Sequence, residues 1–388
     1  MESILTDDFS RIFTQTDGAV CCFAPGRINL IGEHIDYSGG HVLPCALSMG
    51  TYCVARRRSD RKLRFFSKNF PDAGMIECDL DALRLNRTNG WANYALGVLW
   101  ALEQQGMALM SGMDMYVCGN IPNGAGLSSS ASLEVLTGFA AKELFGFPID
   151  MRQLAVISQR AENSFVGVKC GIMDQMAIAM GRSGCALFIN TATLNCEYIP
   201  MRLEGYGILI MNTRKRRELV DSKYNQRRAQ CAHALAQLRA KIDIASLCEL
   251  SPEGFQEYKS LITDPIERKR VKHAVYENMR ASLSCVLLQN GDTMGFGKLM
   301  NESHISLRDD YDVTGTELDT LVECAWEQQG VAGARMTGGG FGGCALAIAQ
   351  TSQMERISAR IGEEYLRRIG YAAEFYTGIA GDGPRRIL

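Results

Sequence analysis

The sequence lacks the features that mark membrane proteins and nucleic-acid-binding proteins. Its uninterrupted apolar runs, such as residues 94–102, are far shorter than the ~18 residues that a membrane-crossing helix requires. No basic stretch precedes an apolar one at the start, as it would in a secretory leader. The 41 Lys and Arg residues are balanced by 43 Asp and Glu residues, which argues against a nucleic-acid partner. We therefore expect a soluble, cytoplasmic protein without membrane or nucleic-acid partners.

Proline is also scarce, and the cysteines show no paired spacing. The chain has 9 prolines against 39 glycines, which indicates tight turns inside compact domains. None of the 14 cysteines forms a CxxC pair, and apart from Cys21 and Cys22 they are scattered singly through apolar segments. We expect reduced core cysteines rather than a zinc site or a disulfide framework.

The length and the order of the predicted elements indicate two domains of the α+β class. A chain of 388 residues exceeds the size at which a single hydrophobic core stops growing. Short β-type runs separated by glycine turns occupy about residues 20–68, and mostly helical patterns follow the strand-like segments near 185–213. The regular βαβ spacing of a doubly wound sheet is absent. We place the boundary near residue 200, with domains at 1–200 and 201–388.

Apolar residues at helical spacing predict several helices in the first half of the chain. One is expected over 91–104, and another runs from about Leu133 to a glycine stop at Gly146. A third helix is expected to begin at Asp150, because Gln153 stands three residues later and completes a capping box. These helices would pack on the predicted strands.

A glycine and serine loop at residues 120–132, NIPNGAGLSSSAS, has the chemistry of an anion site. Gly124 and Gly126 permit torsions and close approaches that a Cβ forbids. The residues Ser128–Ser130 are good helix-capping residues, and the helix that follows offers free N–H groups and a positive dipole end. A di- or triphosphate fits such a cradle. An ordinary glycine-rich turn capped by serine is the alternative.

The same loop lacks the residues of two common nucleotide motifs. A P-loop, GxxxxGK followed by Ser or Thr, would need a lysine, and residues 124–132 contain none. The GxGxxG pattern fails as well, because Leu127, Ser128 and Ser129 follow Gly126. The charge of a bound phosphate must therefore be balanced by a group outside this loop.

Three stretches carry a resemblance to a known superfamily. PNGAGLSSSAS at 122–132 resembles the phosphate loop of the GHMP kinases, which are named for galactokinase, homoserine kinase, mevalonate kinase and phosphomevalonate kinase. ARMTGGGFGGCALA at 334–347 resembles their glycine-rich third motif, and PGRINLIGEHIDYSGGHVLPCAL at 25–47 is similar to the signature of the galactokinase family. The order and spacing of the three match, and weaker similarity between them extends the resemblance over nearly the whole chain.

The resemblance implies a fold and an activity. It implies a two-domain GHMP-kinase-like fold, with a β-rich N-terminal domain in a left–right α/β layering, an α+β C-terminal domain, and an active site in the cleft between them. It also implies a sugar kinase that uses ATP and Mg²⁺ to phosphorylate the anomeric hydroxyl of α-D-galactose. The product, α-D-galactose 1-phosphate, enters the Leloir pathway of galactose metabolism. We expect a monomer, although the sequence leaves the oligomeric state open.

The resemblance also assigns residues to the nucleotide and the metal. The residues of the nucleotide site would be Ser67, Gly124, Ala125, Gly126, Leu127, Ser128, Ser129 and Ser130. Ser130 and Glu162 would bind Mg²⁺ through hard oxygen ligands. Without the resemblance, Glu162 would be read as a solvated or helix-paired carboxylate.

The catalytic pair implied by the resemblance is Asp174 and Arg27. Asp174 stands in an otherwise apolar segment and would take the proton from the anomeric hydroxyl. Arg27 stays protonated and would stabilise both the Asp174 carboxylate and the charge that develops on the attacking oxygen. The residues alone also allow a buried helix-capping Asp174 and an Arg27 that binds turn carbonyls.

The galactose site implied by the resemblance uses carboxylates that accept pairs of adjacent hydroxyls. Its residues would be Glu33, His34, Asp36, Asp174 and Tyr224. The residues alone also allow a capped turn and a half-buried tyrosine. Ile35 departs from the family pattern, which usually has threonine there, and this change bears on the fine preference among sugars.

Two other functions are open to the same sequence. One is a related sugar kinase with another acceptor, such as N-acetylgalactosamine or arabinose. The other is a non-catalytic galactose sensor, but known sensors of this kind lose residues from the serine loop, which is complete here at Ser128–Ala131. The basic run at 214–228 is interrupted by acidic residues, and no interleaved aromatics support base stacking.

Overall fold

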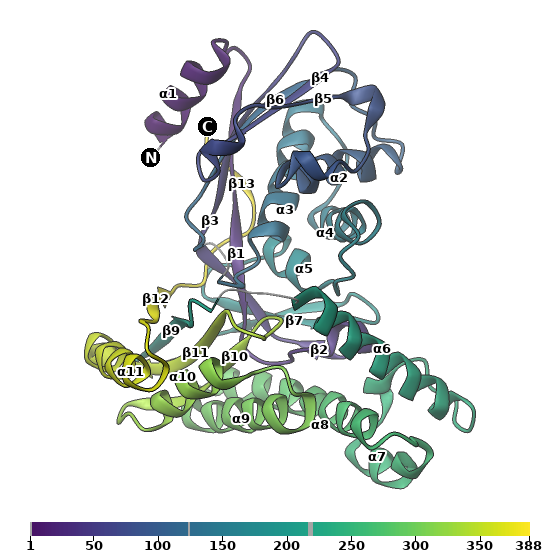
Figure 1. The fold of residues 1–388 in the computed structure, drawn as a ribbon, viewed down its shortest axis with the longest axis vertical. Helices are drawn as coiled ribbons and strands as arrows, with labels where there is room; N and C mark the ends of the chain where they lie inside the picture. Colours follow the sequence, from purple (N-terminus) through teal and green to yellow (C-terminus); the bar gives the residue numbers. More distant parts are fainter. Residues whose placement is uncertain (1, 123–124, 216–219) are drawn as a thin grey trace.

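The computed structural model describes residues 2–122, 125–215 and 220–388 as two lobes stacked along the long axis of the molecule (Figure 1). The upper lobe in that view contains a six-stranded sheet and the lower lobe a four-stranded sheet. A three-stranded sheet of β2 (His41–Val42), β7 (Cys185–Asn190) and β8 (Cys196–Pro200) lies where the lobes meet. The two-domain α+β architecture expected from the sequence is confirmed.

The six-stranded sheet has the strand order β13-β1-β3-β6-β4-β5. Its strands are β1 (Val20–Asn29), β3 (Pro44–Arg57), β4 (Lys62–Ser67), β5 (Ile76–Asp79), β6 (Met113–Gly119) and β13 (Arg385–Arg386). Strand β4 is parallel to β6, and the other neighbours are antiparallel.

Side chains alternate between the two faces of this sheet, and different helices pack on each face. Cys21, Val54 and Tyr116 pair across three strands and pack under α1 (Glu2–Phe13), a helix that the sequence patterns did not predict. Their neighbours Cys22 and Cys53 face the main core. The helices on that side are α2 (Ala92–Glu103), α3 (Ser129–Phe145), α4 (Met151–Arg160) and α5 (Met173–Ala179).

The helix ends expected in this lobe are confirmed. Gly146 ends α3 with φ 71°, in the left-handed region that favours glycine. Asp150 and Gln153 form the capping box of α4, since the Gln153 N–H donates to Asp150 Oδ1 at 2.7 Å and the Asp150 N–H donates to Gln153 Oε1 at 2.9 Å. The α4 helix continues as a π-helical turn, η5 (Ala161–Val166), which carries Glu162.

The lower lobe contains the four-stranded sheet β10-β11-β9-β12 and most of the remaining helices. Its strands are β9 (Tyr206–Asn212), β10 (Val331–Thr337), β11 (Cys344–Gln350) and β12 (Glu374–Gly378). The helices are α6 (Val220–Arg239), α7 (Pro252–Tyr258), α8 (Pro265–Gln289), α9 (Thr293–Ser306), α10 (Thr316–Trp326), α11 (Met354–Ile369) and the π-helical η8 (Leu307–Tyr311). Over the described chain as a whole, the short 3₁₀ turns are η1 (Asp36–Ser38), η2 (Pro71–Ala73), η3 (Leu80–Ala82), η4 (Arg87–Asn89), η6 (Leu247–Glu249), η7 (Lys259–Leu261) and η9 (Thr351–Gln353).

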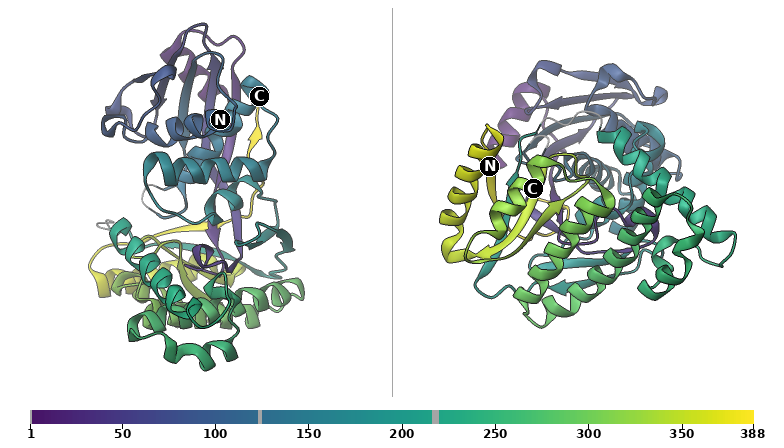
Figure 2. Two further views of the ribbon diagram at one scale, coloured as in Figure 1. Left: turned by 90° about the vertical axis from the view of Figure 1, so that its right-hand side faces the viewer. Right: turned by 60° about the horizontal axis from the view of Figure 1, so that its bottom comes forward.

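The two halves of the chain interlock at both ends of β1. At its far end, the Asn29 N–H donates to Thr337 Oγ1 of β10 at 3.0 Å. Near its start, β1 pairs with β13, the short yellow strand at the C-terminus that returns to the upper lobe (Figure 2). The boundary near residue 200 stays a prediction.

No disulfide bond joins any of the 14 cysteines, all of which are described, and most of them are buried. Burial raises the pKa of Cys45 to about 12, so its thiol stays protonated. In the part of the chain that the structure describes, no helix combines the length and apolarity that a membrane crossing requires.

Helix α9 lies against strand β10 at a contact between backbones. A Cβ on Gly297 would lie 2.2 Å from the carbonyl oxygen of Ala332, and one on Gly333 would lie 2.1 Å from the carbonyl oxygen of Gly297. Both positions therefore require glycine. The contact brings Ser303 of α9 beside Arg335 of β10, with 3.2 Å between Oγ and Nε.

We predict that Gly297→Ala lowers the free energy of unfolding by about 1–3 kcal/mol, because the added methyl group overpacks this contact. The measurement is a urea titration followed by circular dichroism. Gly254→Ala in α7 is the matched control, since its nearest neighbours would lie 3.6 Å from the new Cβ and alanine favours helices. An equal loss in both variants would contradict a special role of the α9–β10 contact.

Candidate active site

A cavity of about 240 Å³ gathers most of the residues that the sequence singled out. Residues from both halves of the chain line it, and they are Arg27, Glu33, His34, Asp36, Gly126, Ser128, Ser129, Ser130, Val168, Cys170, Gly171, Met173, Asp174, Tyr224, Gly338 and Gly339. The galactokinase-like signature, the serine loop, the segment around Asp174, helix α6 and the glycine-rich third motif thus meet at one place.

Arg27 and Asp174 form a bidentate pair in this cavity. Arg27 Nε donates to Asp174 Oδ1 at 2.8 Å, and Nη2 donates to Oδ2 at 2.6 Å. Burial opposes the charge of Arg27, but Asp174 together with Glu33 and Asp36 acts in the opposite direction, and the pKa of the guanidinium is raised overall. The third nitrogen, Nη1, donates to the carbonyl oxygen of Gly126 at 2.9 Å. Arg27 therefore joins the carboxylate to the serine loop.

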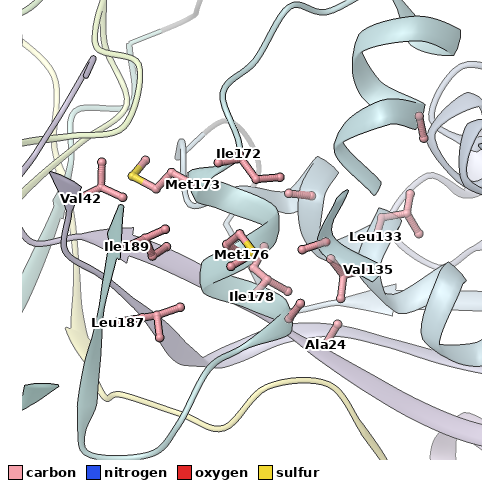
Figure 3. Close-up of a cluster of buried hydrophobic side chains, with 14 of the residues drawn as sticks. Ala24, Val42, Leu133, Val135, Ile172, Met173, Met176, Ile178, Leu187 and Ile189 are labelled. Atoms are coloured by element: carbon pink, nitrogen blue, oxygen red, sulfur yellow. The ribbon is translucent and has the colours of Figure 1, made fainter. Parts of the chain in front are cut away.

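The position of Asp174 follows from the packing of α5, on whose first turn it lies. Figure 3 shows Met173 and Met176 of this helix against Val42 and Ile189 of the three-stranded sheet, with Val135 of α3 on the other side. Apolar contacts on several sides fix the helix, so the carboxylate stands at a defined place on the cavity wall.

The serine loop is tied down by its apolar residues and opens its polar ones to the cavity. Ala125 and Leu127 are buried, and the Leu127 carbonyl accepts from the Arg27 N–H at 3.2 Å. Gly124 lies outside the described residues. Ser128 precedes α3 with φ 61°, and its hydroxyl donates to Asp174 Oδ2 at 2.5 Å.

This bond corrects one expectation from the sequence. Ser128 stands at the capping position, but its hydroxyl makes no cap with the helix, because the left-handed backbone turns it toward Asp174. Ser129 and Ser130 are the first residues of α3 itself. The loop thus uses a serine side chain to hold the carboxylate, and leaves the N–H groups at the helix start available for an anion.

Two buried carboxylates lie behind Ser130. Gln175 Nε2 donates to Glu162 Oε2 at 2.7 Å and to Glu134 Oε2 at 3.0 Å. Burial raises the pKa of Glu162 to about 7, although a bond from Cys170 and, more weakly, one from Ser130 act in the opposite direction. Burial, reinforced by Glu162, also holds the pKa of Glu134 well above its usual range. Glu134 Oε1 has no hydrogen-bond partner among the described residues.

Glu134 and Gln175 were missed by the sequence reasoning. Glu134 stands next to Leu133 in an apolar helical pattern, which gave no sign that a carboxylate would be buried there. Gln175 follows Asp174 directly and carries no charge of its own. The only available signal was the polarity of these residues inside otherwise apolar helices.

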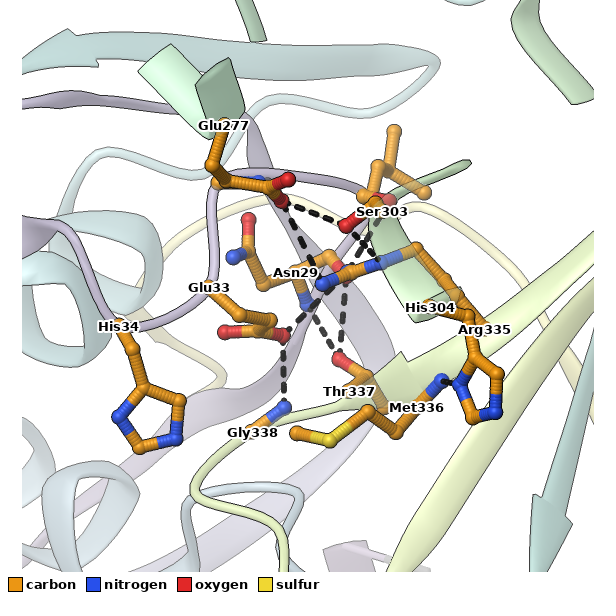
Figure 4. Close-up of polar contacts among 12 residues, drawn as sticks. Asn29, Glu33, His34, Glu277, Ser303, His304, Arg335, Met336, Thr337 and Gly338 are labelled. Atoms are coloured by element: carbon orange, nitrogen blue, oxygen red, sulfur yellow. Dashed lines mark hydrogen bonds and ion pairs between the residues drawn. The ribbon is translucent and has the colours of Figure 1, made fainter. Parts of the chain in front are cut away.

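Glu33 is part of a buried polar network (Figure 4). Its Oε1 accepts from the Gly338 N–H at 2.7 Å and lies 3.5 Å from Nη1 of Arg335. Burial raises the pKa of Glu33, and the charges of Arg335 and Arg27 offset part of this effect. Gly338 and Arg335 both belong to the glycine-rich third motif, but the sequence gave no role to Arg335.

His34 is a neutral imidazole in a chain of hydrogen bonds. Nε2 lies 3.2 Å from the Gly339 carbonyl, which can only accept, so Nε2 carries the proton and Nδ1 accepts from the Tyr37 hydroxyl at 2.9 Å. Burial, together with the nearby His273, lowers the pKa of His34 to about 3. The Tyr224 ring lies 5.3 Å from the His34 ring, between centroids.

The Asp36 side chain packs directly against the backbone of Gly171. A Cβ on Gly171 would lie 1.7 Å from Asp36 Oδ2, so only glycine leaves room for this carboxylate. Burial raises the pKa of Asp36 to about 7, and the negative charges of Asp174 and Glu33 add to the effect. A carboxyl with this pKa is half protonated near neutral pH.

Two positions of interest lie away from the cavity wall. Ile35 is fully buried in the core, and a Cβ on Gly40 would lie 2.7 Å from its Cδ1. The position that departs from the family pattern therefore does not face the cavity. Ser67 is buried at the end of β4, where its hydroxyl accepts from the Asn69 N–H at 3.2 Å, and it is not among the lining residues. Its nucleotide role stays a prediction.

Three segments of the chain match known domains or signatures of protein families. They are the N-terminal domain of GHMP kinases over residues 93–182, the galactose-binding signature of galactokinases over 7–57, and the C-terminal domain of GHMP kinases over 285–367. A galactokinase of Ligilactobacillus salivarius is 50% identical over 384 residues, which cover 99% of both chains. A galactokinase of Enterococcus faecalis is 49% identical over 388 residues, which cover 100% of both.

Solved structures agree with these sequence matches. Lactococcus lactis galactokinase complexed with galactose superposes with a TM-score of 0.98 at 43% identity, covering 100% of each chain. Methanococcus jannaschii mevalonate kinase superposes with a TM-score of 0.67 at 18% identity, covering 95% of this chain and 100% of that one, which shows a shared fold alone.

The raised pKa of Asp36 predicts a pH dependence of stability that Asp36→Asn lacks. Between the ordinary pKa of 3.8 and the folded-state pKa of about 7, the native protein keeps a proton that the unfolded chain has released. Wild-type stability therefore falls as pH rises through this window, by at most about 1.4 kcal/mol per pH unit. We expect the unfolding free energy of the variant minus that of the wild type to increase from pH 5 to pH 7 in urea titrations.

Glu162 titrates in the same window but is present in both proteins, so its contribution cancels in the difference. A difference that stays constant across the window would show that Asp36 is ionised throughout in the folded protein.

Proposed function

The chain belongs to the galactokinase family of the GHMP kinases, and on this basis we propose how its residues carry out the family's reaction. The protein is a sugar kinase that transfers the terminal phosphoryl group of ATP to the anomeric hydroxyl of α-D-galactose. The products are α-D-galactose 1-phosphate and ADP. The roles given below to single residues are our proposals.

We propose that the sugar binds beside Glu33, His34, Asp36 and Tyr224. Carboxylates that accept hydrogen bonds from hydroxyls can distinguish the two configurations at one ring carbon, because an inverted hydroxyl leaves a buried acceptor unpaired. Glu33 and Asp36 would supply these acceptors on the cavity wall. His34 already uses both ring nitrogens within the protein, so we propose that it acts mainly by packing and by holding the turn.

We propose that Asp174 accepts the proton of the anomeric hydroxyl. Arg27 holds the carboxylate through two hydrogen bonds, and Ser128 donates a third. Because phosphoryl transfer passes through a loose transition state, the nucleophile needs positioning more than activation. Arg27 would add electrostatic stabilisation of the attacking oxygen as it loses its proton.

The serine loop would hold the phosphates with the N–H groups at the start of α3. The described lining of the cavity contains one arginine against three carboxylates, and that arginine is already paired. Among the described lining residues no unpaired cation remains to offset the phosphate charge, so we propose that a cation from outside the chain does so.

The residues behind the loop fit Mg²⁺. Ser130 and Glu162 would hold it, as hard oxygen donors, and the unpaired oxygen of Glu134 marks a site short of positive charge. Among the described residues no three His, Cys, Asp or Glu side chains form a metal site by themselves, so the remaining ligands would be phosphate oxygens and water. Bound Mg²⁺ would neutralise part of the phosphate charge.

The observation that carries this proposal is the contact of Arg27 with both Asp174 and Gly126. It brings the proposed base to the proposed phosphate loop inside one cavity. The complete serine loop argues against a non-catalytic galactose sensor, and the burial of Ile35 removes the one departure that bore on another acceptor. The monomeric state and the cytoplasmic location stay predictions.

We expect turnover with galactose in a coupled assay of ADP release across a panel of sugars. The panel contains galactose, glucose, N-acetylgalactosamine and arabinose at equal concentrations, with MgATP. The kcat/KM for galactose should exceed that for glucose by about 10⁴ or more, as for other sites that bind a substrate hydroxyl. Turnover of another sugar without turnover of galactose would overturn the assignment.

We expect Asp174→Asn to lower kcat by about 10²–10⁴, the usual range for loss of general base catalysis. Galactose binding, measured by calorimetry without nucleotide, should change much less, because the amide keeps the size and part of the hydrogen bonding of the carboxylate. Full activity in a folded Asp174→Asn variant would refute the role of Asp174 as the base.

A further inference from the structure

We propose that Arg335 is a positioning residue for the sugar site, which fixes the Glu33 carboxylate for a sugar hydroxyl without touching the sugar. The inference rests on the proposed function in one respect, namely that Glu33 is a galactose ligand. Arg335 does not line the cavity. It lies on β10, three residues before Gly338 of the glycine-rich turn that does, and its side chain is 0% exposed.

The guanidinium of Arg335 ties the end of β1 to the lower lobe (Figure 4). Nη1 donates to the carbonyl oxygens of Asn29 at 3.1 Å and Leu30 at 3.2 Å, and Nε donates to Ser303 Oγ at 3.2 Å. Nη2 makes no hydrogen bond among the described residues. A fully buried cation of this kind needs a carboxylate to offset its charge.

Two carboxylates are near enough to offset the charge of Arg335, and one of them already has another partner. Glu277 lies 3.8 Å from Arg335 Nη2, but its Oε2 accepts from Arg280 Nε at 2.8 Å. Its Oε1 accepts from Ser303 at 2.6 Å and from the Gly32 N–H at 2.9 Å. Burial opposes ionisation, yet Arg280, His273 and Arg335 together lower the pKa of Glu277 to about 2. The negative charge of Glu277 is thus offset mainly by Arg280.

Glu33 is the carboxylate that remains for Arg335. Arg335 Nη1 and the Gly338 N–H approach the same oxygen, Oε1, at 3.5 Å and 2.7 Å. In Figure 4 the other oxygen points away from Arg335, toward the side on which His34 lies. One oxygen is therefore anchored, and the second is presented to the cavity with a defined direction.

The charge of Arg335 matters as much as its place. Glu33 lies in a site whose burial favours the neutral acid, and Arg335 leads the charges that act against it. A neutral Glu33 would carry a proton and lose acceptor capacity toward a hydroxyl. Arg335 would thus keep the group in the form that accepts hydrogen bonds from the sugar.

The experiment compares Arg335→Met with Arg335→Lys by calorimetry with galactose, without nucleotide, and by steady-state kinetics. We expect Arg335→Met to raise the galactose Kd and KM about 10- to 100-fold, the range for a hydrogen bond to a charged group. The kcat at saturating galactose and the KM for ATP should change less than about threefold, because Arg27, Asp174 and the serine loop are untouched. Arg335→Lys keeps the charge and should recover part of the affinity.

A double-mutant cycle separates positioning from a general structural effect. Glu33→Gln alone should weaken galactose binding, and adding Arg335→Met to it should cost less than about a further twofold. If the two losses multiplied in full, Arg335 would not act through Glu33 and the proposal would fail. An unchanged galactose Kd in folded Arg335→Met would overturn it as well.

Two further variants keep the test decisive. Arg56→Met removes another buried arginine, paired with Asp114 at 2.7 Å in the upper sheet, and should leave the galactose Kd unchanged even if it lowers stability. If Arg335→Met does not fold, Ser303→Ala removes the acceptor of Arg335 Nε, and the same cycle with Glu33→Gln applies. A wild type that does not bind galactose would refute the proposed function, whereas failure of the cycle alone would refute only the role of Arg335.

Discussion

The bidentate contact between Arg27 and Asp174 is the interaction on which the rest of the cavity depends. It joins the start of the galactokinase-like signature to the first turn of α5, and through Gly126 it reaches the serine loop. Three carboxylates share the cavity wall, and like charges in one buried space repel each other. Arg27 offsets one of them directly, which reduces the repulsion among the three.

A second arginine offsets the neighbouring carboxylate from behind the wall. Arg335 lies in the lower lobe and Glu33 follows β1 of the upper sheet, so their contact exists only when the lobes are docked. The Gly297 and Gly333 contact brings α9 and β10 together, and Ser303 then orients the guanidinium. Packing that looks remote from the chemistry therefore sets the direction of a carboxylate inside the cavity.

The serine loop lacks a lysine, and two buried carboxyl groups lie behind it. Gln175 bridges Glu134 and Glu162, and burial raises the pKa of both carboxyls. A site with these properties favours a proton or a divalent cation, and a triphosphate that arrives with Mg²⁺ brings its own compensation. This differs from a P-loop, in which a lysine of the chain reaches the phosphates.

The sequence by itself determined the fold class, the main helices with their Gly146 and Asp150 ends, and more than half of the cavity residues, because short motifs and apolar periodicity are local properties. It did not predict α1, and it gave no role to Arg335, Gly171 or Glu134. Only the tertiary structure decided which of two carboxylates Arg335 serves, where Ile35 points, and that Ser128 binds Asp174 instead of capping α3. These outcomes depend on distances between residues far apart in the chain, which the order of the amino acids does not state.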